Sequence, residues 1–497
     1  MGGAVLIRNA EVDGVARVDV RTDGARITAV GPGLDRSPDE ATVDARGGAL
    51  LPGLHDHHVH LRAWAATRWS VRLAVADGPD DFDRRVREAV AAAPPDVWLR
   101  GIGWHESTGG PLDRHRLDAL TGSRPTRIQH RTGVLWVLNS AALALTGAAG
   151  STADGVERDA TGEPTGRLWR ADGWLRERTA PLRDPFPEVL ADLARQAAAW
   201  GVTRWTDATP GRDQAETTAL AALWSSGRGD SPAGTSAPAE RGAADPGAGR
   251  PGAGRPGAAG ASGLRLPWLV LMSPPGLSLP AGTAVRLGPQ KLILDDATLP
   301  TVDALAATIG DSHATGSPVA VHCVTAEQLV TLVAAIEEAG AVPGDRVEHA
   351  GIVPPGYTAR LAALGLAVVT NPGFLADRGD AYQRDVPAPE RDWLYPVRSL
   401  RDAGVRVAAA TDAPFGPPDP WVAIAAARDR RTPDGDVLGP DERVPASVAL
   451  GLFLADPDRP GHQRRIAPGH PADLCLLHTP LATALAAPSS EHVRTTL

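Results

Sequence analysis

Cysteine and long apolar runs are scarce in this sequence, and their scarcity excludes whole classes of protein. Cysteine occurs only twice in 497 residues, at Cys323 and Cys475. Two cysteines cannot build the disulfide framework of a small secreted protein, and such low usage is typical of the reducing cytosol. No uncharged apolar run approaches the roughly 20 residues that a membrane span needs, and the N-terminus lacks the basic and apolar regions of a signal peptide. We therefore expect a soluble, cytoplasmic protein.

The chain also lacks an excess of positive charge. The formal net charge is −9 and the sequence pI is about 5.9, which argues against nucleic acid or an anionic membrane as the main partner. Hydrophobic residues make up 43% and charged residues 22% of the chain, a composition typical of soluble enzymes. We expect a small-molecule substrate and no nucleic-acid or membrane partner, and we leave a homodimer open.

Both ends of the chain carry short strand-like segments. The runs AVLIRNAEV, ARVDVRT, ARITAVG and ATVDARGGALLPG near the start alternate apolar and polar residues and are separated by Asp-Gly and Gly-Pro turns. This pattern predicts antiparallel strands. The stretch RRIAPGHPADLCLLHTP near the C-terminus has the same character. We predict one small β-sandwich domain built from residues 1–53 and 465–497.

The middle of the chain, residues 54–464, alternates between buried strands and amphipathic helices. Runs such as PVAVHCVT, LGLAVVTNPG and GVRVAAATDAP are apolar on both faces, as strands of a parallel sheet are. Thr325 and Gln328 stand at capping-box spacing before a helical run that ends at Gly340. We predict an α/β fold in which eight such units form a TIM-like (β/α)8 barrel.

One segment inside this region has a different composition. Residues 225–263 are rich in Gly, Pro, Ala and Ser and nearly free of large apolar side chains. Such a segment cannot bury enough surface to offset its ordering entropy, so we predict a disordered insertion. Deleting it should leave the melting transition nearly unchanged.

The stretch GLHDHHVHL contains four histidines and an aspartate. Imidazole is the commonest side-chain metal ligand, but alternate residues of a strand point to opposite faces. Asp56, His58 and His60 therefore share one face, and His55 and His57 share the other. From this alternation alone, either histidine pair is a candidate for metal binding.

Further residues of ligand type lie near the ends of later predicted strands, namely His322, His349 and Asp412, and Lys291 falls on the strand before them. Taken singly, a hydrogen-bonded core histidine or a helix-capping aspartate explains each of them. Together they stand where barrel enzymes place their active sites. Lys291 is the single lysine among 50 cationic residues, which suggests a role that arginine cannot fill.

These motifs resemble those of a known family. LPGLHDHHVHL is similar to the first-strand motif of the amidohydrolase superfamily. The stretches GIGWHES, NSAAL, KLILDD, VEHAGI, YPVRSLRDAGVRVAAATDAPFGPPDPW and IAPGHPADLCLL resemble its YtcJ-like branch, which includes N-substituted formamide deformylases. The resemblance covers nearly the whole chain outside the insertion.

The resemblance implies a set of metal ligands. Pro52–Gly53, Asp56 and the HxH overlay the family pattern, so His58 and His60 would be ligands and His55 and His57 would not. The overlay further implies that His58, His60 and Asp412 hold one ion, that His322 and His349 hold a second, and that Lys291, as a carbamate formed with CO₂, bridges them. Such ligands suit two zinc ions, with manganese, iron and nickel as alternatives.

The implied activity is hydrolysis of a non-peptide C–N bond, such as an amide or formamide, by a metal-activated hydroxide. Asp412 would take the proton of that water and pass it to the leaving amine. The alternatives are a mononuclear deaminase or ester or lactone hydrolase, and a catalytically inactive binding or assembly protein. The last is disfavoured because all six ligand positions are filled.

The sequence departs from the family pattern near the expected pocket. Val134 stands where a histidine is common, Asn371–Pro372 replaces Gln-Pro, and His105 follows Trp104 where an acidic or amide residue is usual. We therefore predict Trp104, His105 and Trp136 as pocket residues, with core packing as the alternative for the two tryptophans.

Overall fold

The computed structural model describes residues 4–74, 76–94, 97–151, 155–179, 186–227 and 266–497. The described chain divides into two compact units, the first formed by Met1–His60 and Ala191–Leu497 and the second by Leu61–Leu190. Helix α8 (Gln214–Gly227) includes the first three residues of the predicted insertion. The remainder of that prediction, from Arg228 to Gly263, lies outside the described residues.

The N-terminal strands form a four-stranded sheet in the order β3-β2-β1-β4. Its strands are β1 (Val5–Val12), β2 (Val15–Thr22), β3 (Ile27–Gly31) and β4 (Ala41–Asp44). The pairs β1–β2 and β2–β3 are antiparallel, as predicted. The prediction was wrong for β4, which is parallel to β1. The segment between β3 and β4 crosses to the opposite edge of the sheet, and its Leu34 amide is held there by Asp19 Oδ2 at 3.0 Å.

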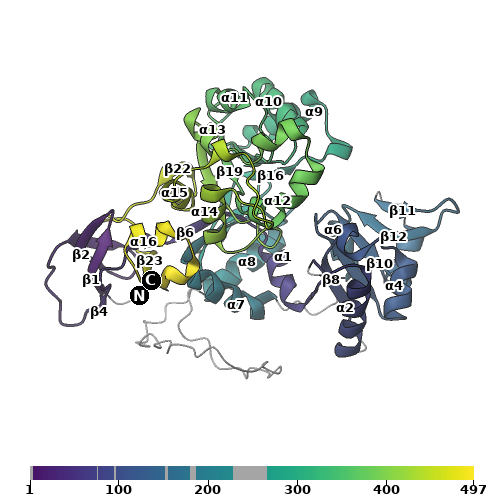
Figure 1. Cartoon of the computed structure of the whole chain (residues 1–497), viewed down its shortest axis with the longest axis horizontal. Coiled ribbons are helices and arrows are strands. Elements are labelled where there is room, and N and C mark those ends of the chain that lie inside the picture. The colour runs from purple at the N-terminus through teal and green to yellow at the C-terminus, as the bar shows by residue number, and fades with distance from the viewer. Residues whose placement is uncertain (1–3, 75, 95–96, 152–154, 180–185, 228–265) are drawn as a thin grey trace. The chain divides into compact units, whose positions relative to one another are not determined.

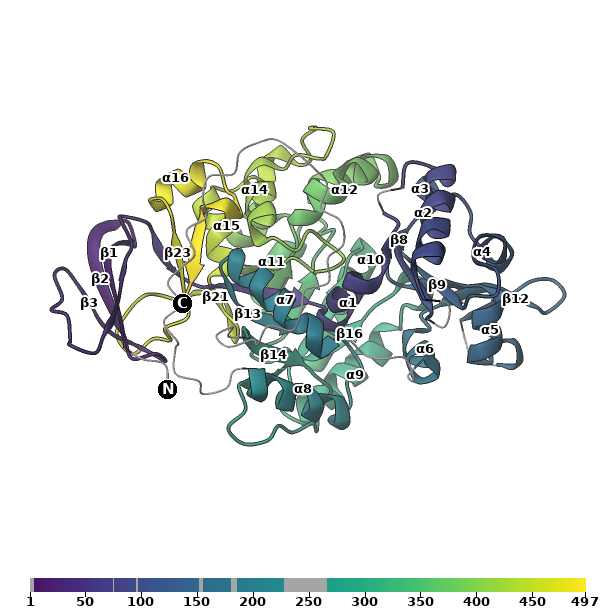
Figure 2. The same ribbon diagram turned by 90° about the horizontal axis from the view of Figure 1, so that it is seen from below.

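A second small sheet joins the two ends of the chain. It has the order β24-β23-β5 and consists of β5 (Leu50–Pro52), β23 (Leu474–Leu477) and β24 (Val493–Thr496). Ile7, Val20 and Leu50 pack in one buried cluster with Ile466 and Leu474. Apolar side chains from both chain ends therefore share one hydrophobic core, and β1 lies near β23 in both views (Figures 1 and 2).

Two parallel sheets form the centre of the first unit. One has the order β15-β14-β13-β6 and the other β16-β17-β18-β19-β20. The strands are β6 (Leu54–Val59), β13 (Val202–Asp207), β14 (Trp268–Met272), β15 (Val285–Gly288), β16 (Gln290–Ile293), β17 (Val319–Cys323), β18 (Arg346–His349), β19 (Ala367–Thr370) and β20 (Arg406–Ala409). Each of β17 to β20 is parallel to its neighbour. The predicted parallel strands are confirmed.

Hydrogen bonds connect the edges of these sheets. Pro289 separates β15 from β16, since proline has no amide hydrogen for the ladder. The carbonyl of Pro289 still accepts a bond from the Ser273 amide at 3.2 Å. At the other edge, the Asp412 amide donates to the His58 carbonyl at 2.9 Å and the His60 amide to that of Ala413 at 2.8 Å. The end of β6 is thereby fixed beside the segment that follows β20.

Helices surround these strands in both views (Figures 1 and 2). They are α7 (Phe186–Ala199), α8, α9 (Val302–Ala314), α10 (Ala326–Ala339), α11 (Tyr357–Ala363), α12 (Gly373–Asp385), α13 (Val397–Asp402), α14 (Pro420–Asp429) and α15 (Ala446–Phe453). The predicted start of α10 is confirmed, because Thr325 Oγ1 accepts from the Gln328 amide at 3.3 Å. Gln328 Oε1 accepts from Val324 instead of Thr325, one residue before the position that a capping box uses.

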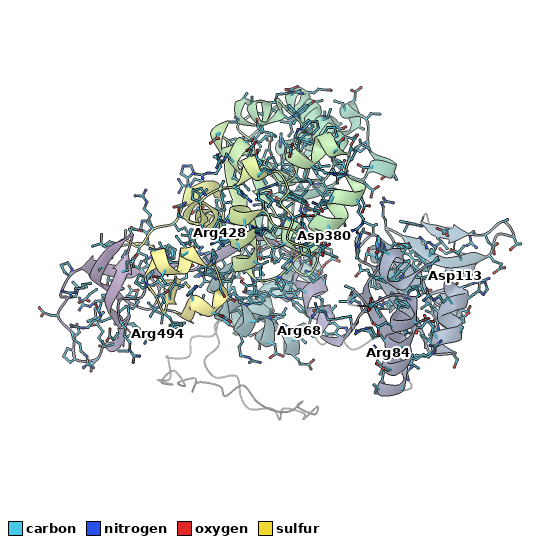
Figure 3. All side chains as sticks on the ribbon, viewed as in Figure 1. Arg68, Arg84, Asp113, Asp380, Arg428 and Arg494 are labelled. Carbon is cyan, nitrogen blue, oxygen red and sulfur yellow. The ribbon has the colours of Figure 1, made fainter. Side chains whose placement is uncertain are left out.

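The second unit contains a mixed sheet in the order β11-β12-β10-β9-β8-β7. Its strands are β7 (Val71–Arg72), β8 (Leu99–Trp104), β9 (Thr126–His130), β10 (Leu135–Leu138), β11 (Val156–Arg158) and β12 (Pro164–Trp169), with helices α2 (Pro79–Ala92), α4 (Arg114–Thr121), α5 (Ser140–Thr146) and α6 (Asp172–Thr179). Arg84 of α2 is labelled in Figure 3. It pairs with Glu88 one turn later on the exposed face of this helix, at 2.7 Å. The sequence patterns do not separate this unit from the strand–helix repeats around it.

Candidate metal centre

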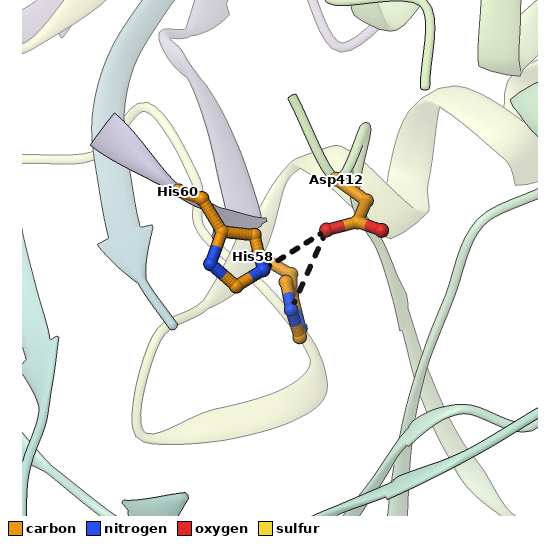
Figure 4. Close-up of side chains that lie close together, drawn as sticks. All are labelled: His58, His60 and Asp412. Atoms are coloured by element: carbon orange, nitrogen blue, oxygen red, sulfur yellow. Dashed lines mark ion pairs between the residues drawn. The ribbon is translucent and has the colours of Figure 1, made fainter. Parts of the chain in front are cut away.

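His58, His60 and Asp412 form a compact cluster in the first unit, hereafter the β6 cluster (Figure 4). Asp412 Oδ1 lies 3.6 Å from His58 Nε2 and 3.3 Å from His60 Nε2. His58 lies on β6, His60 directly follows it, and Asp412 follows β20. The cluster therefore stands at the carboxyl ends of these strands.

Asp56 fixes the segment that carries Asp412. Asp56 Oδ1 accepts from the Thr411 amide at 3.0 Å, and its Oδ2 accepts from the Thr411 hydroxyl. Burial raises the pKa of Asp56 to about 7. Asp412 itself has a φ of 58°, a left-handed conformation that non-glycine residues adopt at a cost and that is often found at functional sites.

His322, His349 and Lys291 lie beside the β6 cluster. The His349 ring is 4.7 Å from that of His58 and 4.6 Å from that of His322, measured between centroids. Lys291 Nζ is 3.5 Å from His58 Nε2. The structure thus brings all six residues of the predicted ligand set to one region of the first unit. Within that region, only the three members of the β6 cluster meet in one group of potential ligand atoms among the described residues.

Burial sets the protonation states in this region. It lowers the pKa of His58 and His349 well below the usual value and that of His322 to about 3. It also lowers the pKa of Lys291 to about 8. These imidazoles are neutral at pH 7 and keep a lone pair for a metal. The Lys291 amine loses its proton far more readily than an exposed lysine does.

Hydrogen bonds orient two of the imidazoles for metal binding. His58 Nδ1 donates to Glu348 Oε2, and His349 Nδ1 donates to Asn371 Oδ1 at 2.8 Å. In each ring the lone pair is then on Nε2. Metal-binding histidines are usually held by such a bond from the other ring nitrogen, and the structure shows this arrangement twice.

The donor set also fits a divalent cation. Asp412 Oδ1 is buried and has no hydrogen-bond partner within the described part of the chain. A buried carboxylate oxygen without a donor is costly unless a cation neutralises it. Two imidazole nitrogens beside that carboxylate oxygen complete a set of nitrogen and oxygen ligands of the kind that zinc and similar ions prefer.

Comparison with known proteins identifies the family. The amidohydrolase family model matches residues 41–497. This chain is an amidohydrolase family member. The N-substituted formamide deformylase of Arthrobacter pascens is 27% identical over 92% of this chain and 89% of that relative. The putative amidohydrolase YtcJ of Bacillus subtilis (strain 168) is 24% identical over 89% of this chain and 86% of that protein.

The fold of this amidohydrolase is similar to that of solved hydrolases. An uncharacterized metal-dependent hydrolase from Pyrococcus horikoshii OT3 aligns with a TM-score of 0.70 and 18% identity, over 96% of this chain and 97% of that one. The resemblance inferred from the motifs is therefore confirmed at the level of the family, and the prediction of a hydrolase is confirmed with it.

Among the described residues, no helix combines the length and the apolar character that crossing a membrane requires.

Glu348 belongs to this site but was not predicted from the sequence. It is fully buried, bonds His58 and accepts from Arg346 Nε at 2.5 Å. In a regular strand, Glu348 and its neighbour His349 would point to opposite faces of the sheet. The sequence pattern therefore does not place Glu348 beside the predicted ligands. The alternation fails because His349, the last residue of β18, has a φ of 68°. A buried acid beside a predicted ligand is the signal in the sequence that could have found it.

We expect Glu348→Gln to weaken the site without emptying it. Gln keeps the size of the side chain, but its amide oxygen is a weaker acceptor for the His58 Nδ1 hydrogen. Loss of such a supporting carboxylate typically reduces metal affinity or activity about 10- to 100-fold. Competition with a chelator measures the affinity. Wild-type metal affinity and activity in this variant would show that Glu348 does not position His58.

His55 and His57 lie apart from the β6 cluster. Their rings stack on each other with centroids 4.0 Å apart, and His55 Nε2 bonds Thr206 Oγ1 at 2.9 Å. Neither ring nitrogen of the fully buried His57 has a hydrogen-bond partner among the described residues. Burial lowers the pKa of both rings well below the usual value.

We expect the variant His57→Leu to be at least as stable as the wild type. Leaving a buried polar group without a partner costs about 1–3 kcal/mol, and an apolar side chain avoids that cost. Loss of the stacking contact offsets part of the gain. Thermal unfolding measures the effect, and a melting temperature several degrees lower would mean that His57 has polar contacts in solution.

The predicted pocket residues lie in the second unit. Trp104 is buried in one apolar cluster and Trp136 in another. Their indole nitrogens donate to Gly110 O at 3.1 Å and Asp172 Oδ1 at 2.8 Å. His105 accepts from the Ser107 amide at 3.1 Å. The packing of the tryptophans follows the alternative given for them, and their contact with substrate stays a prediction.

Proposed function

We propose that this amidohydrolase uses a divalent cation held by His58, His60 and Asp412 to hydrolyse a non-peptide C–N bond, as in an amide or formamide. The observation that carries the proposal concerns Asp412 Oδ1, which is buried, has no hydrogen-bond partner among the described residues and lies 3.3 and 3.6 Å from two imidazole nitrogens. Similarity to the N-substituted formamide deformylase over most of both chains supports the bond type.

The proposal extends to a second ion. His322 and His349 would hold it, and Lys291, as a carbamate, would bridge the two ions. The lowered pKa of Lys291, about 8, supports this because only the neutral amine reacts with CO₂. We propose zinc for both positions because imidazole and carboxylate ligands suit it.

When bound, the cation would acidify a water molecule and polarise the scissile carbonyl. The chain's own residues then have separate tasks. Asp412 accepts the proton of the attacking water and delivers it to the departing amine. Glu348 holds His58, and Asn371 holds His349, so that both rings keep their Nε2 atoms directed at the site.

A one-ion site is the second candidate. It is favoured by the fact that the β6 cluster is complete with three ligands, without His322 or His349. This candidate would perform deamination or ester or lactone hydrolysis, with Lys291 serving only to pack and balance charge. The number of tightly bound ions per chain separates the two candidates.

We further propose that the two parallel sheets close into one (β/α)8 barrel. The bonds from Asp412 and His60 at one edge, and Pro289 at the other, support closure. We keep the proposed β-sandwich domain of residues 1–53 and 465–497, which the shared core of the two chain ends supports.

The experiment that tests the function is a hydrolysis screen on the metal-loaded protein. Formamides, N-acyl amines, carbamates and lactones would be offered, and release of amine or acid would be measured. We expect turnover of at least one C–N substrate that stops when the metal is chelated and returns when zinc is added. Turnover of lactones or esters alone would favour the second candidate.

A further inference from the structure

A second group of metal-type ligands lies in the unit formed by Leu61–Leu190. His105, Glu106 and His130, hereafter the His105 cluster, come together at the ends of two parallel strands. His130 is the last residue of β9, and His105 directly follows β8. Trp104 and His130 are paired in register, so the two imidazoles emerge at the same edge of the sheet.

The distances within this cluster match those of the β6 cluster. Glu106 Oε2 lies 3.2 Å from His130 Nε2 and 4.0 Å from His105 Nε2, against 3.3 and 3.6 Å around Asp412. Ligand atoms bound tetrahedrally to zinc at about 2.0–2.1 Å lie roughly 3.3 Å from one another. A small movement of the His105 ring would complete that geometry.

Each imidazole has a hydroxyl group at its other nitrogen. His105 Nδ1 is 2.7 Å from Ser107 Oγ, and His130 Nδ1 is 2.8 Å from Thr132 Oγ1. Both Nδ1 atoms also accept a backbone amide hydrogen, from Ser107 at 3.1 Å and from Thr132 at 3.3 Å, so each Nε2 carries the ring hydrogen and faces Glu106. A cation at Nε2 would move that hydrogen to Nδ1, where the hydroxyl oxygen can accept it in place of the bond from the backbone amide.

An arginine lies beside the carboxylate of the cluster. Arg167 Nη2 lies 3.7 Å from Glu106 Oε1, so the guanidinium orients the carboxylate through the oxygen that faces away from the imidazoles. Its positive charge makes binding weaker than at a site without an arginine.

We propose that His105, Glu106 and His130 form a second, separate binding site for a divalent cation of the zinc type. Three protein ligands leave one coordination position open to water or a small anion. The side chains are 25%, 43% and 11% exposed, so an ion has access from solvent. The proposal is independent of the number of ions at the β6 cluster.

Metal counting on the full-length protein tests the proposal. Wild type and variants would be loaded with zinc, freed of unbound metal and analysed by mass spectrometry. We expect Glu106→Gln and His130→Ala each to hold about one ion per chain fewer than wild type, since two ligands alone bind zinc weakly. The matched control is His115→Ala, an exposed histidine of the same unit, which should keep the wild-type count.

Two comparisons make the outcome decisive. If either variant fails to fold, as judged by its melting transition, the other decides. A wild-type zinc count in the folded variants overturns the proposal. The His60→Ala variant separates this site from the proposed active centre, because the double variant with Glu106→Gln should lose the sum of both single losses. Loss in Glu106→Gln but not in His60→Ala would leave this site standing while the active-site proposal fails.

Discussion

The His60→Ala variant should lose metal from the β6 cluster and nearly all hydrolytic activity. His60 Nε2 is 3.3 Å from Asp412 Oδ1, and no other His, Cys, Asp or Glu of the described residues belongs to this group of potential ligands. Since loss of a mere supporting residue costs about 10- to 100-fold, we expect loss of a direct ligand to reduce kcat/KM by more than about 100-fold. Steady-state kinetics and metal analysis measure the two effects.

His57→Leu is the matched control for this experiment. His57 lies on the same strand, but its ring stacks on His55 and not on the cluster. We expect this variant to keep its metal and its activity, and we expect His58→Ala to behave like His60→Ala. Equal loss of metal in His57→Leu and His60→Ala would show that the wrong face of β6 had been assigned.

Lys291→Arg should be nearly inactive and short of metal. Arginine occupies 49 of the 50 cationic positions and lysine only this one. A guanidinium stays protonated and cannot form a carbamate, whereas a lysine amine can. The buried Nζ lies 3.5 Å from His58 Nε2, so a permanent positive charge at this position would also repel the cation. We expect activity to fall by more than about 100-fold, as for loss of a ligand.

Rescue separates a bridging carbamate from a merely structural lysine. Lys291→Ala leaves space beside His58, and added acetate or formate can supply the missing carboxylate oxygens. We expect partial recovery of activity and metal content that depends on the carboxylate concentration. An Arg variant with full activity and the wild-type number of ions would contradict the assignment of Lys291 as a ligand.

Much of the fold follows from local pattern. Strands β17, β19 and β20 are mostly apolar on both faces, so their only stable place is inside a sheet covered on both sides. Helix α10 is bounded by Thr325, whose side chain caps its start, and by Gly340, which follows its end with a positive φ of 82°. Each of these features depends on residues close together in the sequence.

Other features depend on contacts between distant residues and could not be predicted. The pairing of β4 with β1 depends on where the connecting segment crosses the sheet, and Asp19 contributes to that choice. The Leu61–Leu190 unit is compact by its own contacts. Its strands and helices have the same local patterns as those of the first unit, so the sequence pattern does not mark where this unit begins and ends.

The sequence alone determined the candidate ligands, since HxH, the strand-end residues and the lone lysine are visible in one dimension. The tertiary structure decided which other atoms orient these ligands. It placed Glu348 against His58, across 290 positions, and Asn371 against His349. It also buried Asp412 Oδ1 where none of the residues that the structure describes donates a hydrogen bond to it. Hydrogen bonds and burial act over a few ångströms in space, and only folding brings residues so distant in the chain within that range.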